Sequence, residues 1–248
     1  MEFEQIKFYI FSALAALVAL TVHEFCHGYA AYRLGDNTAK NLGRLTFNPL
    51  KHIDLVGVLC MIVFHVGWAK PVPVNSRNFR NPRRGFAITA LAGPLSNIIL
   101  GFFGVGAYLL VYALARGQEI EQGFTLALIT NLLYFLNIFF SVNIGLGIFN
   151  LLPIPPFDGS RIAYVFLPPK LYFGVMRHER KIYLGVLIWL VLGDTVAAVL
   201  RSIPIIAAVP LLNTLAGVFS LSGMIGAAIQ FIVELLFKLW QLIPFLRF

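Results

Sequence analysis

Long apolar runs alternate with short polar segments along this chain. The first run, residues 8–32, exceeds the about 20 apolar residues that a helix needs to cross a bilayer. Four later runs have the same character, at residues 85–115, 124–152, 183–200 and 203–228. The last 20 residues place polar side chains on one stripe, which suits either an interfacial helix or a further span. The pattern predicts an all-α polytopic membrane protein with five or six transmembrane helices.

The composition agrees with an integral membrane protein. Hydrophobic residues make up 59% of the chain and charged residues only 12%, whereas a soluble domain carries about 25% charged residues. The net charge of +8 does not indicate nucleic-acid binding, because the basic residues lie beside the apolar runs instead of along one stripe. Two cysteines, Cys26 and Cys60, are too few for a disulfide framework. We therefore expect a single domain surrounded by lipid.

Basic residues on both sides of residues 52–69 indicate that this apolar stretch does not cross the membrane. Residues 70–84 contain five basic residues and no acidic one, and residues 33–51 contain four basic residues. Both segments should therefore be cytoplasmic. We predict that residues 52–69 enter the membrane and return, as a short re-entrant, strand-like element between the first and second helices.

Residues 21–28 place two histidines and a glutamate inside the first apolar run. On a helix, His23 and His27 are four residues apart and share a face, so both imidazoles can reach one metal ion. His-Glu-x-x-His on a helix is a zinc-hydrolase motif, in which the glutamate, here Glu24, takes a proton from water. The alternatives are a chance match and a pair of core histidines satisfied by hydrogen bonds.

A catalytic zinc ion usually has three protein ligands, so a third ligand is needed from elsewhere in the chain. The candidates are Asp158, Asp54, His52, His65 and Asp194. Asp158 follows a segment with three prolines, which ends the preceding helix on the cytoplasmic side. His52 and Asp54 begin the re-entrant segment and can also approach, whereas Asp194 lies near the far end of its helix.

Four motifs follow one another in the chain: His-Glu-Phe-Cys-His-Gly at 23–28, Gly-Trp-Ala-Lys-Pro-Val-Pro-Val-Asn at 67–75, Ala-Gly-Pro-Leu-Ser-Asn at 92–97 and Asn-Leu-Leu-Pro-Ile-Pro-Pro-Phe-Asp-Gly at 150–159. Together they resemble the site-2 protease family of intramembrane zinc metalloproteases. The resemblance implies that His23, His27 and Asp158 hold one zinc ion. It also implies that Glu24 is the general base and that Asn97 and Asn150 bind substrate near the scissile bond.

The resemblance further implies a metalloendopeptidase that hydrolyses a peptide bond within or near the transmembrane segment of a single-span membrane protein, in regulated intramembrane proteolysis. Such an enzyme would be a multi-pass protein, in the plasma (inner) membrane if prokaryotic, with its active site towards the cytoplasm. The chain has no room for a PDZ or CBS domain, so we expect a minimal form. This is one protease domain over residues 1–248, with a catalytic core at about 8–165 and C-terminal helices at 182–248.

Two other functions compete with this one. A membrane transporter or channel could use the same buried histidines and carboxylates as an ion path, although that does not explain why Glu24 directly follows the first histidine. A catalytically inactive relative could bind membrane partners without cutting them. We expect no nucleic-acid partner, and the sequence leaves the oligomeric state open.

Overall fold

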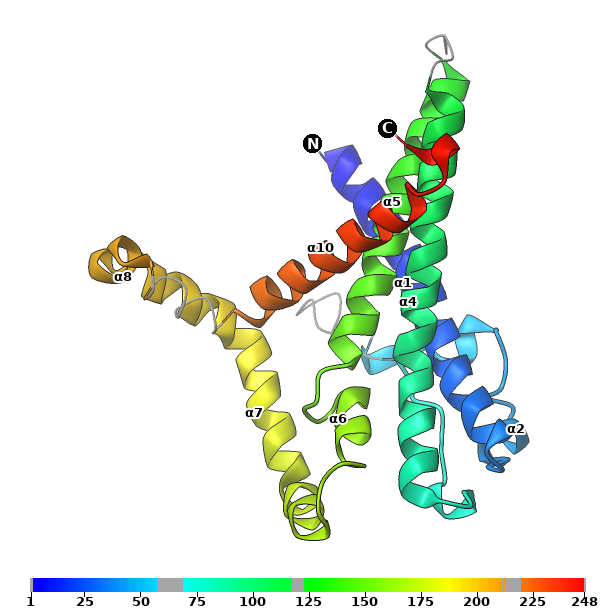
Figure 1. The fold of residues 1–248 in the computed structure, drawn as a ribbon, viewed down its shortest axis with the longest axis vertical. Helices are drawn as coiled ribbons and strands as arrows, with labels where there is room; N and C mark the ends of the chain where they lie inside the picture. Colours follow the sequence, from blue (N-terminus) through cyan, green and yellow to red (C-terminus); the bar gives the residue numbers. More distant parts are fainter. Residues whose placement is uncertain (1, 58–68, 117–122, 211, 213–219, 248) are drawn as a thin grey trace.

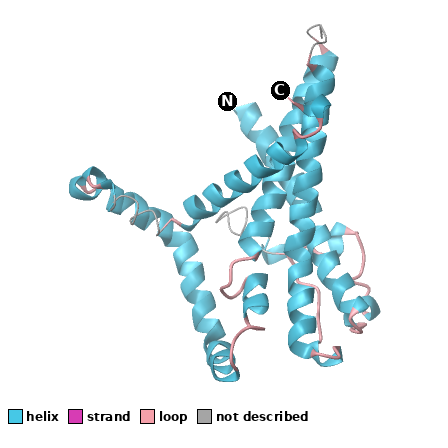
Figure 2. Ribbon diagram, in the orientation of Figure 1, coloured by secondary structure: helices cyan, strands magenta, loops and turns pink. Residues whose placement is uncertain are grey.

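Three long helices form an upright bundle at the centre of the molecule (Figure 1). They are α1 (Glu2–Arg33), α4 (Pro82–Ala115) and α5 (Phe124–Asn150), and each packs against the other two. The computed structural model describes residues 2–57, 69–116, 123–210, 212 and 220–247. Within these ranges the secondary structure is helical, with loops between the helices (Figure 2).

The remaining helices are arranged around this bundle. The short α6 (Asp158–Ala163) follows α5 and packs against α4, and α10 (Leu221–Trp240) crosses the bundle and contacts α4 and α5. Between them, α7 (Pro169–Ser202) leans away from the bundle and leads to α8 (Pro204–Ala208) (Figure 1). Four short elements complete the described part of the chain: α2 (Thr38–Asn41) and the 3-10 helices η1 (Pro49–Lys51), η2 (Ser76–Asn78) and η3 (Pro244–Leu246).

The membrane-spanning character that the sequence predicts is confirmed for the described helices. By length and composition, α1, α4, α5 and α10 can each cross a membrane, and α7 can be a fifth span if its two bent parts count as one. The expected number was five or six. The expected and observed numbers of spans differ because of the run at residues 203–228. This run contains α8 and the start of α10, and its residues 211 and 213–219 lie outside the described ranges.

The two ends of the predicted re-entrant segment lie side by side. Ile53 and Ala69 form an isolated antiparallel bridge, and the amide of Lys70 donates to the carbonyl of His52 at 2.8 Å. A full membrane crossing would separate these ends by about 30 Å, so the chain leaves and returns at one level. Residues 58–68, which would form the element itself, lie outside the described residues.

An apolar core holds the upper part of the bundle together. Val105 and Leu109 of α4 pack with Phe140 and Ile144 of α5, and Trp240 of α10 covers them. Lipid provides no hydrophobic force between helices, so their association relies on close packing, and small side chains allow the backbones to approach. A Cβ atom at Gly106, for example, would lie 2.4 Å from the Trp240 ring. The glycines of α4 therefore set the distance between the helices.

A buried carboxylate fastens the loop that follows α1. Asp36 is completely buried and accepts hydrogen bonds from the amides of Thr38 and Asn75, and from the side chain of Asn78 at 2.7 Å. Burial by itself would raise the pKa of Asp36, but these hydrogen bonds hold it below its usual value. The charged carboxylate thus fixes the segment around residue 75 against the end of α1.

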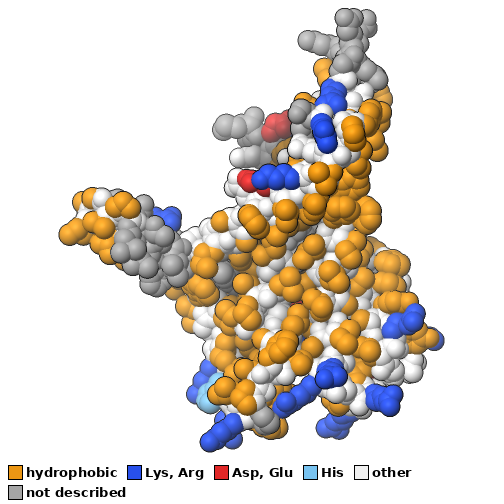
Figure 3. All heavy atoms as spheres, viewed as in Figure 1, with side chains coloured by type: hydrophobic (Ala, Val, Ile, Leu, Met, Phe, Trp, Pro, Cys, Tyr) orange, Lys and Arg blue, Asp and Glu red, His pale blue; other side chains and the backbone are white. Residues whose placement is uncertain are grey.

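The surface shows how charge and apolar side chains are distributed. Figure 3 shows Lys and Arg side chains gathered at the end of the molecule where α4 begins, with mostly apolar side chains above them. Basic residues at one end and an apolar band beside it are the distribution expected of a helix bundle in a bilayer.

Candidate metal centre

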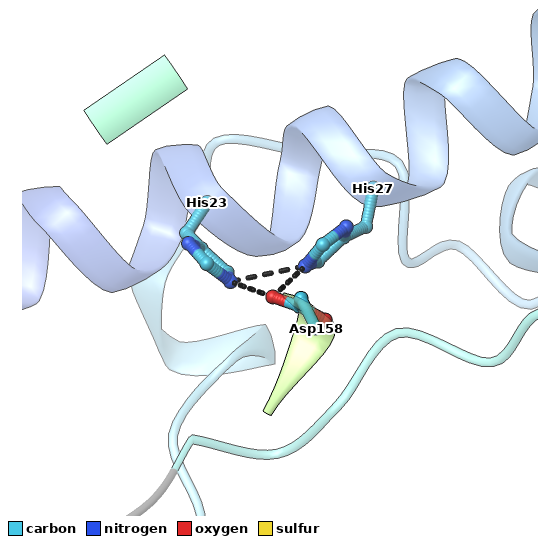
Figure 4. Close-up of side chains that lie close together, drawn as sticks. All are labelled: His23, His27 and Asp158. Carbon is cyan, nitrogen blue, oxygen red and sulfur yellow. Dashed lines mark hydrogen bonds and ion pairs between the residues drawn. The ribbon is translucent and has the colours of Figure 1, made fainter. Parts of the chain in front are cut away.

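The motif at residues 23–27 lies on α1 where this helix meets α4. Because an α-helix makes one turn every 3.6 residues, the two imidazoles lie one above the other. His23 and Glu24 are buried, with 4% and 9% of their surface exposed. Figure 4 shows both imidazole rings directed at Asp158, the first residue of α6.

Three potential ligand atoms converge at this point. The Asp158 Oδ2 atom lies 3.1 Å from Nε2 of His23 and 3.1 Å from Nε2 of His27, and the two Nε2 atoms are 3.0 Å apart. Burial alone would raise the pKa of Asp158, but hydrogen bonds from the imidazoles of His23 and His27 in their protonated form lower it to about 2. Among the described residues, this is the one group of His, Cys, Asp and Glu side chains close enough to share a metal ion.

Hydrogen bonds behind the imidazoles set the direction in which each ring presents its lone pair. Nδ1 of His27 lies 2.7 Å from the carbonyl oxygen of Thr89, and Nδ1 of His23 lies 2.6 Å from Oδ1 of Asn97. Both oxygens only accept, so both Nδ1 atoms carry the proton and both neutral rings present a bare Nε2. Fixing a ring through its second nitrogen in this way is typical of metal-binding histidines.

These donors fit a divalent metal ion. Two bare nitrogens and an ionised carboxylate repel one another unless a cation or a proton lies between them. Two imidazoles and one carboxylate are also a donor set of catalytic zinc sites, in which the fourth position stays open for water or substrate. The arrangement of His23, His27 and Asp158 can therefore hold one ion and leave a reactive position on it.

Gly93 of α4 keeps space free in front of the two rings. A Cβ atom there would lie 2.4 Å from Nε2 of His27 and 2.7 Å from Nε2 of His23. Both distances are far below the separation of about 3.5 Å at which non-bonded atoms make van der Waals contact. Any side chain at this position would occupy the space between α4 and the imidazoles.

The segment after α5 brings Asp158 to the site. The helix ends at Asn150, and the three prolines that follow cannot continue it. The chain then folds back so tightly that a Cβ atom at Gly159 would lie 2.1 Å from the carbonyl oxygen of Leu151. Only glycine permits this approach, and it places the carboxylate of Asp158 below α1.

Glu24 is held by the proline-containing segment at residues 71–75. Its Oε2 atom accepts a hydrogen bond from the backbone amide of Val72 at 2.7 Å. Val72 lies between Pro71 and Pro73, which have no amide hydrogen, so it is the only residue of these three that can donate. The carboxylate next to the first histidine thus has a defined position.

The other candidates for the third ligand lie elsewhere. Nε2 of His52 bonds the carbonyl oxygen of Thr46 at 2.8 Å, and Oδ1 of Asp54 accepts from the amide of Gly57. Asp194 belongs to α7 and not to the converging group. His65 lies outside the described residues.

The two asparagines predicted to bind substrate occupy different environments. Asn97 is completely buried, and its Nδ2 donates to the carbonyl oxygen of Ala19 and to Oδ1 of Asn143 while its Oδ1 faces His23. Asn150, the last residue of α5, is half-buried, and its Nδ2 donates to the carbonyl oxygen of Leu146. Neither residue's role in substrate binding is tested by these contacts, so both stay predictions.

Sequence reasoning missed the residues that surround and support the site. Gly93, Thr89, Val72 and Asn143 all touch the motif residues or their partners. Asn143 gave the clearest signal, since an amide in the middle of an apolar helix requires a partner. Two of the others act through backbone atoms, which leave no mark on the residue type.

Comparison with known proteins places the chain among metalloproteases. The model of a family described as "Peptidase family M50" matches residues 11–192. "Putative zinc metalloprotease YwhC" of Bacillus subtilis is 45% identical over 156 residues, which are 63% of this chain and 68% of that protein. "Putative zinc metalloprotease MJ0611" of Methanocaldococcus jannaschii is 30% identical over 156 residues, 62% of this chain and 69% of the relative. No solved structure matches the chain significantly.

Proposed function

Because the chain belongs to peptidase family M50, the site-2 protease family, we propose that it hydrolyses a peptide bond within or near the transmembrane segment of a single-span membrane protein. The observation that carries this proposal is the convergence of His23, His27 and Asp158 inside a bundle of helices long enough to cross a bilayer. A protease site at this place acts on chains that are themselves in the membrane.

One zinc ion is the proposed cofactor, as the names of both relatives suggest. His23 and His27 would bind it through Nε2, and Asp158 through a carboxylate oxygen. When bound, such an ion lowers the pKa of a water molecule to about 7 and polarises a peptide carbonyl. The protein then has to orient the substrate carbonyl and move the protons.

Glu24 is the proposed general base and acid. Its carboxylate takes a proton from the attacking water and later gives a proton to the leaving amine. The hydrogen bond from Val72 supports this role, because it fixes Oε2 and so orients the carboxylate during both transfers. Burial of Glu24 keeps bulk water from competing for the proton.

A substrate helix has to unwind before it can be cut, because its peptide carbonyls are already hydrogen-bonded within the helix. The extended segment at residues 71–75 passes beside Glu24 and is a suitable surface for an unwound strand, which would replace lost helical hydrogen bonds with new ones to this segment. Asn150, the last residue of α5 before the turn that brings Asp158 to the site, is the proposed contact to the substrate backbone. For Asn97, its hydrogen bonds favour support of His23 over contact with substrate.

We propose that the site lies towards the cytoplasmic side of the membrane, which is the plasma (inner) membrane if the protein is prokaryotic. The support is the cluster of Lys and Arg at the end of the bundle where α4 begins. We also propose that residues 1–248 form one protease domain with a catalytic core at about 8–165, since the residues of the site come from α1, α4, α6 and the segment before α4.

The test compares the wild type with Glu24→Gln and, as a matched control, Glu234→Gln on the exposed side of α10. Each variant is co-expressed with tagged single-span membrane proteins, and the zinc content of the purified protein is measured. We expect about one zinc ion in all three and a loss of cleavage by about 10²–10⁴-fold in Glu24→Gln alone, the usual contribution of general acid–base catalysis.

Two results would overturn the proposal. Cleavage that persists in Glu24→Gln would show that this carboxylate is not the base. Zinc binding without cleavage of any single-span protein, in the wild type, would instead favour an inactive relative that only binds membrane partners.

A further inference from the structure

A second buried amide, Asn143 of α5, has no part in the proposed reaction. Its side chain is completely buried among apolar helices. An amide placed there without partners would be strongly unfavourable, and both of its polar atoms are in fact bonded. Its Oδ1 accepts from Nδ2 of Asn97 at 3.1 Å, and its Nδ2 donates to the carbonyl oxygen of Phe139 at 2.8 Å.

The partners of the two amides fix the direction of every hydrogen bond. The carbonyl oxygens of Phe139 and Ala19 only accept, so each faces an Nδ2 atom. Turning Asn143 over would place its Oδ1 against the carbonyl of Phe139. Turning Asn97 over would place its Oδ1 against two oxygens, those of Ala19 and Asn143. The network therefore has one favourable arrangement, and in it Oδ1 of Asn97 faces His23.

The surrounding helices hold this arrangement rigidly. Asn97 lies on α4, Asn143 on α5 and Ala19 on α1, so the three central helices meet at this level. Close approaches lie on both sides of it: a Cβ atom at Gly101 would lie 2.5 Å from Ile144, and one at Gly147 would lie 3.0 Å from the carbonyl oxygen of Pro94. The helices that carry the two amides are therefore closely packed on both sides of them.

We propose that Asn143 is a positioning residue of the metal centre, which acts on His23 through Asn97. By holding Oδ1 of Asn97 towards Nδ1 of His23, it keeps the proton on Nδ1 and the lone pair of Nε2 directed at the ion. The inference rests on the proposed function, since it assigns a role towards the zinc ion. It makes Asn97 part of the support of the metal centre and not a substrate contact.

His23 and His27 differ in the kind of group that holds Nδ1 of each ring. His27 is held by a backbone carbonyl, which helix α4 supplies whatever the residue type. His23 is held by two side chains in series, so its orientation depends on Asn97 and Asn143. Mutation can remove the support of His23 alone, which makes the proposal testable.

The experiment uses the full-length protein in detergent with three variants. Asn143→Leu removes the acceptor of Asn97 while keeping the same number of side-chain heavy atoms. Asn143→Asp keeps an oxygen at that position and, as a neutral carboxylic acid, can still donate to the carbonyl oxygen of Phe139. Asn137→Leu, the same substitution at an exposed site of the same helix, is the matched control. For each variant we would measure the zinc dissociation constant by competition with a chromogenic chelator, the visible absorption spectrum of the cobalt-loaded protein, and kcat and KM for a cleaved substrate.

We expect Asn143→Leu to weaken zinc binding by about tenfold, the lower end of the effect of outer-shell partners. The cobalt absorption bands should change because the geometry at one imidazole changes, and kcat should fall while KM stays similar. Asn143→Asp should restore most of the zinc affinity and the cobalt spectrum, and Asn137→Leu should match the wild type in all three measurements.

The proposal is overturned if Asn143→Leu folds and binds zinc with the affinity and cobalt spectrum of Asn137→Leu, even if it is less stable. It is also overturned if Asn143→Asp fails to restore either property, since a retained acceptor would then not matter. A wild type without zinc would contradict the proposed function itself. This outcome is distinct from a failure of the Asn143 proposal, because it concerns the unmodified protein and not the variants.

Discussion

In each half of α4 a glycine allows a close approach to a neighbouring side chain, but the two approaches serve different purposes. Before Asn97, the helix passes the imidazoles at Gly93 and supplies the carbonyl of Thr89 to His27. After it, the helix passes the indole of Trp240 at Gly106 and packs in the apolar core. In both halves a glycine allows a close approach, but one approach leaves space for an ion and the other closes a core. Substitutions in the first half of α4 should therefore affect the metal centre, and substitutions in the second half should affect stability.

The largest effect is expected from Gly93→Ala. The added methyl group would occupy the space in front of Nε2 of His23 and His27, so zinc affinity and cleavage should fall by more than about 100-fold, beyond the usual effect of a lost outer partner. Since the ends of the imidazoles can swing aside, and alanine favours a helix, the fold should survive.

The measurement for Gly93→Ala is zinc content, cleavage rate and Tm on one preparation. Gly174→Ala is the matched control, because no described atom lies within 4 Å of the added carbon there. A Gly93→Ala protein that retains zinc and activity would show that the space between α4 and the rings is not the ion's place.

Gly106→Ala should give the opposite result. The methyl group would meet the ring of Trp240, which is fixed by stacking on Phe102 and by a hydrogen bond to the Phe102 carbonyl. Overpacking of this kind typically destabilises a protein by about 1–3 kcal/mol. We expect a lower Tm with unchanged zinc content per folded molecule, measured by thermal unfolding and metal analysis. Loss of zinc at full stability would contradict the division of α4 into two halves.

Asp36→Asn extends the comparison to the loop before α4. The pKa of Asp36 is lowered in the folded protein, so its contribution to stability is present at neutral pH and is lost as the pH falls below the usual aspartate value of about 3.9. At pH 7 the variant should be less stable by about 1.5 kcal/mol, as for one hydrogen bond to a charged group. The difference in Tm between variant and wild type should shrink as the pH falls to about 3. A difference that stays constant with pH would exclude the charge as its cause.

Thr89→Val should have the smallest effect. Thr89 binds His27 through its carbonyl oxygen, and its buried hydroxyl has no hydrogen-bond partner among the described residues. Valine keeps the carbonyl and removes the hydroxyl, so zinc affinity should not change and stability should change by less than about 1 kcal/mol. A zinc affinity well below that of the wild type would show that the hydroxyl serves the site.

The sequence predicted the converging group but not its support. Spacing placed His23 and His27 on one face of a helix, and the family resemblance then selected Asp158 among five candidates. The hydrogen bonds from His23 to Asn97 and from Asn97 to Asn143 could not be predicted in the same way. It depends on how α4 and α5 are placed along each other, because Asn97 and Asn143 meet only if both lie at the level of Ala19.

Charge predicted the path of the chain better than hydrophobicity did. The apolar run at residues 52–69 resembles a span, yet the basic residues on both sides indicated a return, and Ile53 does pair with Ala69. At the C-terminal end no such charges help. Hydrophobicity alone left the polar stripe of the last helix open between interface and span, and only packing of Trp240 in the core places α10 against the bundle.

The hydrogen bond between Val72 and Glu24 has a consequence for substitution experiments. The donor is a backbone amide, so exchanging the side chain of Val72 leaves the bond in place, and any effect of such a variant comes from the buried valine side chain instead. Proline is the exception, because it alone lacks the amide hydrogen. Pro71 and Pro73 already have none, so a single proline at position 72 would leave three consecutive residues without a donor. Alanine at position 72 therefore does not test this hydrogen bond, whereas proline removes it.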